Sequence, residues 1–294
     1  MTTVQEALTL AGSAPAVEPR RRRRRTKGRW ALPAGLALLG VLLGSALLSK
    51  VWTPYPPDAT GVGPVYAPPS AEHWFGTDRV GADVFSRTVA AGLTDVSITI
   101  AVVALALTVG TLWGALAGFY GGILDAVTLR LLEVVQAFPA LLLAMLAVAV
   151  AGPGLLNVVL VVAIIPLPDY VRLARADVLS KKNWQFAEAA RMVGNRPVVV
   201  LFKHLVPNSM RPLLAFASIS ASWVTGNIAA LGYVGLGIEP GSAEWGSMIS
   251  RGQDAIVSGD WWISFFPGVA ILLLCISFHL IGDGLSDKNA GERR

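Results

Sequence analysis

The side chains that could carry out chemistry are few in this chain and lie far apart in the sequence. Its three histidines, His73, His204 and His279, do not form the His-Glu-x-x-His spacing of a helical zinc site. The one cysteine, Cys275, lies within an apolar run, where it is expected to be a small buried side chain. The sequence has neither a Gly-x-x-x-x-Gly-Lys-Ser/Thr phosphate loop nor a Gly-x-Ser-x-Gly nucleophile elbow. We therefore expect no catalytic residue, no metal site and no cofactor bound by this chain.

Charged residues are concentrated instead in residues 173–208 of a chain that is 54% hydrophobic and only 15% charged. Soluble domains carry about 25% charged residues, so the deficit indicates a membrane protein. Within this segment, Asn183 is suited to cap a helix that ends at Gly194, and Pro197 fits the first turn of a second helix. Pro207 is expected to break that second helix. Such a pair could form a compact knob that seats in another protein, and the alternative is an amphipathic linker on the membrane.

Six apolar segments are long enough to cross a hydrocarbon core of about 30 Å, which takes about 20 helical residues. They cover residues 31–50, 95–119, 128–151, 155–172, 209–236 and 261–283. Pro139 is expected to kink the third segment, and Pro166 and Pro168 interrupt the fourth. The sequence therefore predicts an all-α integral membrane protein with six transmembrane helices.

Glycines within the apolar segments predict where helices approach each other closely. Gly110, Gly114 and Gly118 recur every four residues and share one face of the second segment, so a neighbouring backbone can come near. Gly40 and Gly44 give the first segment a similar packing seam.

The distribution of Lys and Arg predicts which side of the membrane each connection faces. Twenty of the 24 basic residues, including Arg20–Arg25, fall on the side of the N-terminus, and only Arg79, Arg87 and Arg251 fall on the other. Because positively charged connections stay in the cytoplasm, we expect both termini to be cytoplasmic. We expect the run Arg20–Arg25 to fix this orientation and to attract lipid headgroups rather than to bind nucleic acid. The first segment is expected to be a retained anchor and not a cleaved signal.

These patterns divide the chain into consecutive parts. We expect a disordered basic cytoplasmic tail, a first transmembrane helix, an extracytoplasmic segment, a five-helix core and a second cytoplasmic tail, covering residues 1–29, 30–52, 53–94, 95–284 and 285–294. In the extracytoplasmic segment, Asp78, Asp83 and Arg87 are expected to build a salt-bridged local structure. Residues 238–260 are expected to form a second outward-facing loop.

The charged segment resembles the cytoplasmic EAA loop of permease subunits of ABC importers. Glu188-Ala189-Ala190 is followed by Gly194 and Pro207 at the spacing of that loop, and residues 203–208 resemble its version in peptide transporters. Residues 73–87 resemble the family segment HPLGTDxxGRDVxSR, with Ala82 in place of the usual Arg. Residues 244–248 and 282–285 resemble C-terminal signatures of the family. The resemblance covers about residues 30–288 and points to the C-type permease of oligopeptide or dipeptide importers.

The resemblance implies a type I ABC importer permease fold with a cytoplasmic coupling helix, in a bacterial plasma membrane. The implied partners are a second homologous permease, two ATP-binding subunits or domains, an extracytoplasmic substrate-binding protein and membrane lipid. ATP and Mg would be used only by the partner ATPases, so this chain would not be an enzyme by itself. The residues implied to contact the ATPases are Phe186, Ala187, Glu188, Ala189, Ala190, Arg191, Gly194 and Pro207.

A translocation path is expected between the two permeases. Ser218, Ser222, Thr225 and Asn227 of the fifth span could contact a peptide backbone regardless of its sequence, and the alternative is hydrogen bonding between helices. A nickel-importing permease of the same branch is a rival interpretation of the whole chain. A free-standing membrane transporter or a membrane enzyme is the alternative from a different class.

Overall fold

The fold consists of long apolar helices and a few short ones. The computed structural model describes residues 28–152, 154–238 and 242–291, so all but the last two residues of the expected N-terminal tail lie outside the described part. Four continuous helices are long and apolar enough to cross a membrane: α2 (Gly28–Leu48), α3 (Val84–Tyr120), the unbroken run of α9 (Pro197–Val199), η1 (Val200–Leu205) and α10 (Val206–Tyr233), and α12 (Trp262–Gly291).

Two further spans are bent pairs of helices: α4 (Gly122–Gln136) with α5 (Ala140–Ala151), and α6 (Leu155–Ile164) with α7 (Leu167–Lys181). The first pair bends by 87° just before Pro139, which precedes the first residue of α5. The second bends by 48° where Pro166 precedes α7. Both proline predictions are confirmed, because proline lacks the N–H that would continue the helical ladder. With each bent pair counted as one span, the described residues hold the six expected spans.

Two helix boundaries differ from the sequence prediction. α3 begins at Val84 and not at residue 95, because the Asp83 side chain accepts a 2.8 Å hydrogen bond from the Ser86 N–H and caps the helix. Its 37 residues span about 55 Å, well beyond the apolar core, so polar residues occupy its first turns. α12 continues to Gly291 and includes most of the expected C-terminal tail.

The glycine face of α3 packs directly on α7, as expected. A Cβ atom added to Gly114 would lie 2.2 Å from the carbonyl oxygen of Val171, and at Gly110 and Gly118 it would meet α7 at 2.5 and 2.6 Å. The backbones therefore touch without intervening side chains, which is the purpose of small residues at membrane helix crossings.

The seam expected on α2 is wrong within this chain. A Cβ atom at Gly40 or Gly44 would meet nothing within 4 Å. The close approach is made instead by Gly35, where an added Cβ would lie 2.8 Å from the Ser277 carbonyl oxygen of α12, and by Gly284 of α12 against Leu32. Gly40 and Gly44 have the same four-residue spacing as the glycines of α3, but α2 packs against α12 through the face that carries Gly35.

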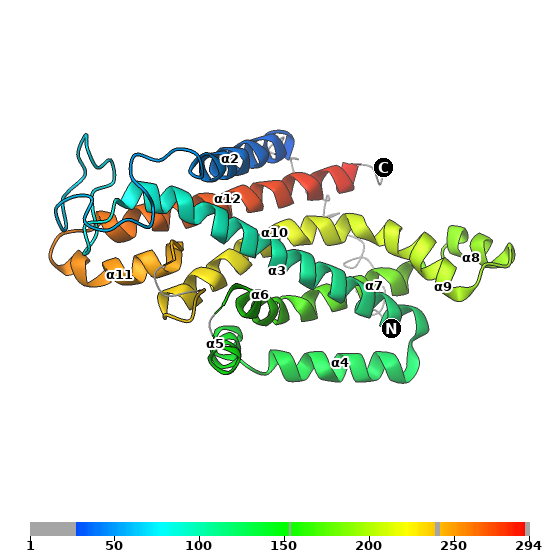
Figure 1. Cartoon of the computed structure of the whole chain (residues 1–294). Coiled ribbons are helices and arrows are strands. Elements are labelled where there is room, and N and C mark those ends of the chain that lie inside the picture. The colour runs from blue at the N-terminus through cyan, green and yellow to red at the C-terminus, as the bar shows by residue number, and fades with distance from the viewer. Residues whose placement is uncertain (1–27, 153, 239–241, 292–294) are drawn as a thin grey trace, which may run out of the picture.

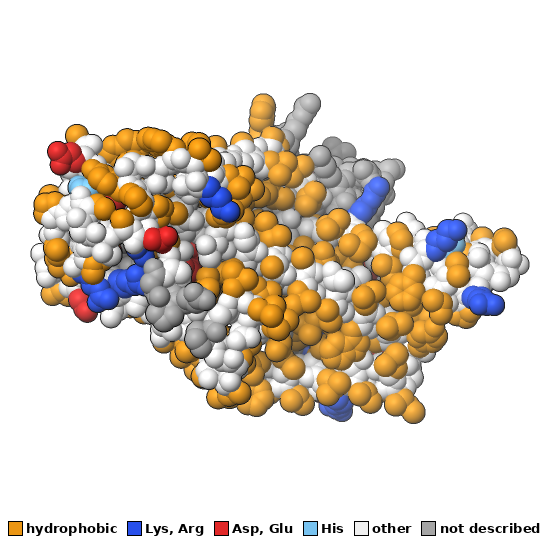
Figure 2. Space-filling view, in the orientation of Figure 1, with side chains coloured by type: hydrophobic (Ala, Val, Ile, Leu, Met, Phe, Trp, Pro, Cys, Tyr) orange, Lys and Arg blue, Asp and Glu red, His pale blue; other side chains and the backbone are white. Residues whose placement is uncertain are grey.

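The long helices α2, α3, α10 and α12 lie side by side, α4 to α7 lie along one side of this bundle, and further short helices lie at its two ends (Figure 1). α8 (Gln185–Met192) projects at one end, and α11 (Trp245–Val257) lies at the other beside the segment that precedes α3. Residues 238–260 are therefore not only a loop, because α11 occupies half of them. Hydrophobic side chains cover most of the middle of the face in Figure 2, as expected of a surface in contact with lipid.

The segment before α3 forms a local structure of hydrogen bonds. His73 Nδ1 lies 2.9 Å from Asp83 Oδ1, with both side chains buried. Asp78 accepts two backbone N–H groups of its own turn, each at 2.9 Å. Arg87 donates to the carbonyl oxygen of Pro57 at 3.1 Å. The expected local structure is present, and Asp83 is in contact with His73.

Candidate functional site

The expected helix–turn–helix is present at the end of the molecule where α8 projects (Figure 1). After α8, Gly194 has φ +87°, and its N–H donates to the Arg191 carbonyl at 2.9 Å. The Asn195 N–H donates to the Ala190 carbonyl at 3.3 Å. These two bonds form a Schellman motif, which needs a left-handed residue at the position of Gly194. The turn reverses the chain into α9.

The start of α8 differs from the prediction. The residue that caps α8 is Trp184, with extended backbone (φ −77°, ψ 152°) and no side-chain capping bond, and not Asn183. The reason is that the chain leaving α7 turns once more, with the Trp184 N–H bonded to the Lys181 carbonyl at 3.0 Å. Asn183 lies inside that turn and is exposed.

The alanines of α8 face the inside of the chain. Ala187 and Ala190 are buried in an apolar cluster with Val178 of α7, Leu201 of η1 and Ala115 of α3. Their small size holds the helix close to its own bundle, so that α8 and the bundle are packed as one body.

The outward face of α8 is formed by other residues. Glu188 and Ala189 are exposed, and Met192 and Val193 are 88% and 83% exposed. Arg191 is also exposed, and its guanidinium lies 5.9 Å from the centre of the Phe119 ring of α3. Met192 and Val193 thus form an exposed apolar tip of α8. Sequence reasoning missed Met192 and Val193, although two apolar residues beside a glycine turn in a charged segment were a usable signal.

Pro207 does not end the second helix, contrary to expectation. The helix runs unbroken from Pro197 to Tyr233, and Pro207 lies in the first turn of α10 after the π-helical turn η1. Pro207 has no N–H to donate, and the wider π-helical turn before it, in which the Val206 N–H donates to the Leu201 carbonyl, lets the helix continue. The buried Lys181 Nζ donates to the Asn208 carbonyl at 2.8 Å and ties α7 to this joint.

The polar residues of the fifth span make hydrogen bonds within this chain. Ser222 donates to the Cys275 carbonyl of α12 at 2.9 Å, and the hydroxyl groups of Thr225 and Thr99 of α3 lie 3.2 Å apart. Ser218 and Asn227 bond to carbonyls of their own helix. The four side chains thus serve different contacts, and a role in the translocation path stays a prediction.

A buried polar cluster at the opposite end was missed by sequence reasoning. The Trp245 N–H donates to Asp95 Oδ2 at 3.2 Å, and its indole N–H donates to the Thr88 carbonyl at 2.8 Å. Glu244 caps α11 by accepting the N–H groups of Gly246 and Ser247 at 2.8 and 2.9 Å. Burial raises the pKa of the Glu244 carboxyl. These bonds lock α11 onto α3, and an acid inside an apolar run, Asp95, was the available signal.

The fold and the projecting helix define an all-helical membrane protein of the transport permease class. The chain belongs to the family of binding-protein-dependent transport system inner membrane components, whose model matches residues 110–289.

Several relatives are peptide transport permeases. The chain is 37% identical to the di/tripeptide transport system permease protein DppC of Pseudomonas aeruginosa, with 86% of this chain and 85% of that protein covered. It is 36% identical to the dipeptide permease DppC of Alkalihalophilus pseudofirmus, over 74% and 72% of the two chains. It is 32% identical to the oligopeptide permease OppC of Bacillus subtilis, over 86% and 83%.

Proposed function

We propose that this chain is the non-catalytic permease subunit of an ATP-driven peptide importer. It forms the translocation path with a second, homologous permease, and two ATPase subunits or domains bind it at α8. A substrate-binding protein delivers peptide to the end of the molecule where α11 lies. ATP and Mg are used by the ATPases alone.

The observation that carries this proposal is the construction of α8. Its inner face packs against α3, α7 and η1, whereas the side chains of Glu188, Met192 and Val193 are exposed. A partner that moves α8 would therefore move the ends of two spans with it, which is how a nucleotide-dependent contact can bias a two-state packing of helices. The unbroken helix from Pro197 to Tyr233 extends that connection across the membrane.

Charge supports placing α8 in the cytoplasm. The basic residues assigned to the inner side far outnumber the three assigned to the outer side, and the positive-inside rule then puts both termini and α8 inside. The segment before α3 and α11 face outward in this orientation, in the plasma membrane of a bacterium.

Peptide is favoured over nickel as cargo. The permeases named above carry peptide, dipeptide or oligopeptide transport in their names. Within the described residues, His, Cys, Asp and Glu side chains do not gather in groups of three that could hold a metal ion. The cavity described below suits a polar organic solute.

The test is ATP-dependent peptide uptake by proteoliposomes that contain the assembled transporter. Glu188→Arg is expected to abolish uptake while the variant chain still inserts into the membrane, because a reversed charge on the exposed face of α8 opposes the ATPase contact. Glu133→Arg, a charge reversal on the exposed part of α4, is the matched control and should transport normally. Normal uptake with Glu188→Arg would contradict the coupling role of α8.

A further inference from the structure

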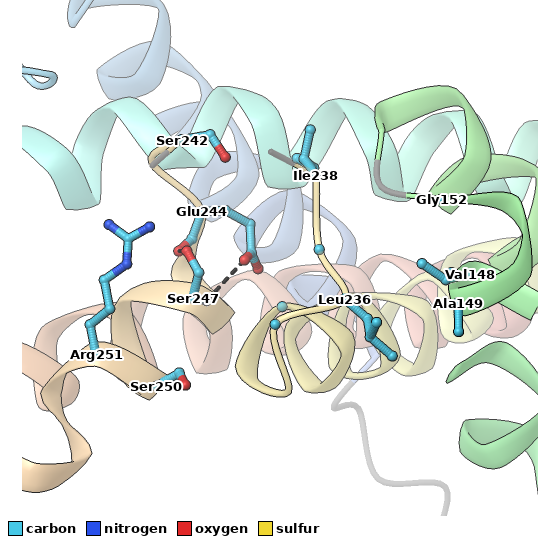
Figure 3. Close-up of a pocket in the computed structure, with 13 residues that line it drawn as sticks. Val148, Ala149, Gly152, Leu236, Ile238, Ser242, Glu244, Ser247, Ser250 and Arg251 are labelled. Atoms are coloured by element: carbon cyan, nitrogen blue, oxygen red, sulfur yellow. Dashed lines mark hydrogen bonds between the residues drawn. The ribbon is translucent and has the colours of Figure 1, made fainter. Parts of the chain in front are cut away.

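A cavity of about 540 Å³ opens between α5, the end of α10 and α11 (Figure 3). Small-ligand sites have volumes of about 300–1,000 Å³. One wall is apolar and includes Val148, Leu236 and Ile238. The facing wall is polar and comes from α11, with Ser247, Ser250 and Arg251. An apolar wall opposite a few polar groups is the usual composition of a site for a small organic molecule.

The polar wall is held in place by Glu244. Ser247 and Arg251 follow it by three and seven residues, so all three share one face of α11. Both carboxyl oxygens of Glu244 accept N–H groups of the first turn, which fixes the direction of the helix. Gly232 leaves room for this carboxylate, since an added Cβ would lie 2.1 Å from Glu244 Oε2 and the carboxylate would have to shift. The Glu244 carboxylate is thus bonded to the first turn of α11, and by fixing this helix it positions Arg251.

Arg251 is the cation of this wall. Among the described carboxylates, none lies within the 4.0 Å of an ion pair with Arg251. Burial lowers the pKa of its guanidinium, and so do the charges of Arg87 and Arg79, while Asp78 and Glu244 act in the opposite direction. The three arginines come from distant parts of the sequence, and they are the three that the charge pattern places outside. Of the three, only Arg251 lines the cavity, where it is partly buried, and a guanidinium in that position favours the binding of an anion.

We propose that Arg251, with the Ser250 hydroxyl of α11, binds the terminal carboxylate of a peptide that enters this cavity from the extracytoplasmic side. The inference rests on the peptide transport proposed above. A guanidinium can hold a carboxylate through two parallel N–H···O bonds, and Ser250 offers a further hydroxyl donor, whereas the Ser247 hydroxyl already donates to the Glu244 carbonyl at 2.9 Å. The apolar wall of α5 and α10 accommodates side chains without selecting among them. The cavity would therefore recognise a group that every unmodified peptide carries.

The test uses the complete transporter with its second permease and ATPases. ATP-dependent uptake of dialanine is measured in proteoliposomes supplied with the binding protein. Separately, the rise in unfolding temperature on adding dialanine or dialanine amide is measured on the purified transporter without binding protein. A ligand that binds the native state raises this temperature. The variants are Arg251→Gln and Arg251→Lys, and the control is Arg130→Gln, which removes an exposed arginine of α4.

Dialanine is expected to stabilise the wild type and the Arg130→Gln control, and dialanine amide is not. Arg251→Gln should lose this stabilisation and transport dialanine about tenfold more slowly or worse, as for the loss of a hydrogen-bonded charge. Arg251→Lys should keep only part of the stabilisation, and it decides the question if the glutamine variant does not assemble.

Two results would overturn the proposal. One is equal stabilisation of the wild type by dialanine and its amide. The other is full stabilisation of Arg251→Gln by dialanine, even with slower uptake, since Arg251 would then act in docking the binding protein. Absence of ATP-dependent uptake by the wild type would contradict the proposed function, and the temperature measurements would still decide the carboxylate site.

Discussion

Replacing Gly114 by alanine should force α3 and α7 apart. The new Cβ would lie 2.2 Å from the carbonyl oxygen of Val171, and ordinary contact begins at 3.4 Å, so the two helices would have to separate by about 1.2 Å. The obstructing atoms belong to backbone, since Arg175 N would also lie at 3.0 Å, and a side-chain rotation cannot relieve the clash.

The expected cost follows from the two opposing effects of the substitution. Overpacking of this kind costs about 1–3 kcal/mol. Alanine in the interior of a helix is otherwise more favourable than glycine by about 0.5–1 kcal/mol. Gly40→Ala is the matched control, because its Cβ would meet nothing within 4 Å and only the favourable effect operates. Because the favourable effect is common to both variants, they should differ by the overpacking cost alone, about 1–3 kcal/mol in the free energy of unfolding.

The assay is unfolding of the purified chain in mixed micelles by increasing SDS, followed by tryptophan fluorescence. Gly114→Ala should unfold at lower SDS than the wild type, and Gly40→Ala at the same SDS or higher. Equal transitions for the two variants would refute the backbone contact between α3 and α7.

Two further predictions concern the ends of the molecule. Gly194→Ala should lower the free energy of unfolding by about 1–2 kcal/mol, because the φ of +87° at this position is strained for alanine. Amide hydrogen exchange in α8 should become faster in this variant. Unchanged exchange would count against the Schellman turn. Because burial raises the pKa of Glu244 in the folded state, stability should fall as pH rises above the usual pKa of about 4.3, and Glu244→Gln, which cannot ionise, should flatten this dependence. An identical pH dependence in wild type and variant would show that Glu244 is not the group responsible.

The features that the sequence predicted well are local ones. Apolar length predicts the spans, and the helix breaks of the two bent pairs fall at Pro139 and Pro166. Gly194 ends α8 because the bonds of that turn involve only its immediate neighbours. The EAA loop could therefore be assigned a helix–turn–helix structure without knowledge of the rest of the fold.

The features that it could not predict depend on which face a helix turns toward its neighbours. Gly35 packs against a neighbouring helix and Gly40 does not, although Gly40 and Gly44 have the four-residue spacing of a packing seam. Ala187 and Ala190 point inward because α7 and η1 lie beneath α8, which no local rule reveals. Pro207 leaves its helix intact because the π-helical turn before it adjusts. The link between Asp95 and Trp245 joins residues 150 positions apart and becomes visible only in the folded chain.

The assignment as a coupled permease is tested most directly by isolating the intact chain with a C-terminal tag. It would be extracted in mild detergent, and the proteins that co-purify would be identified by mass spectrometry. We expect a second multi-span permease and at least one ATPase, and Glu188→Arg should retain the permease and lose the ATPase. A chain that purifies alone, under conditions that keep other membrane complexes together, would contradict the assignment and favour a free-standing transporter.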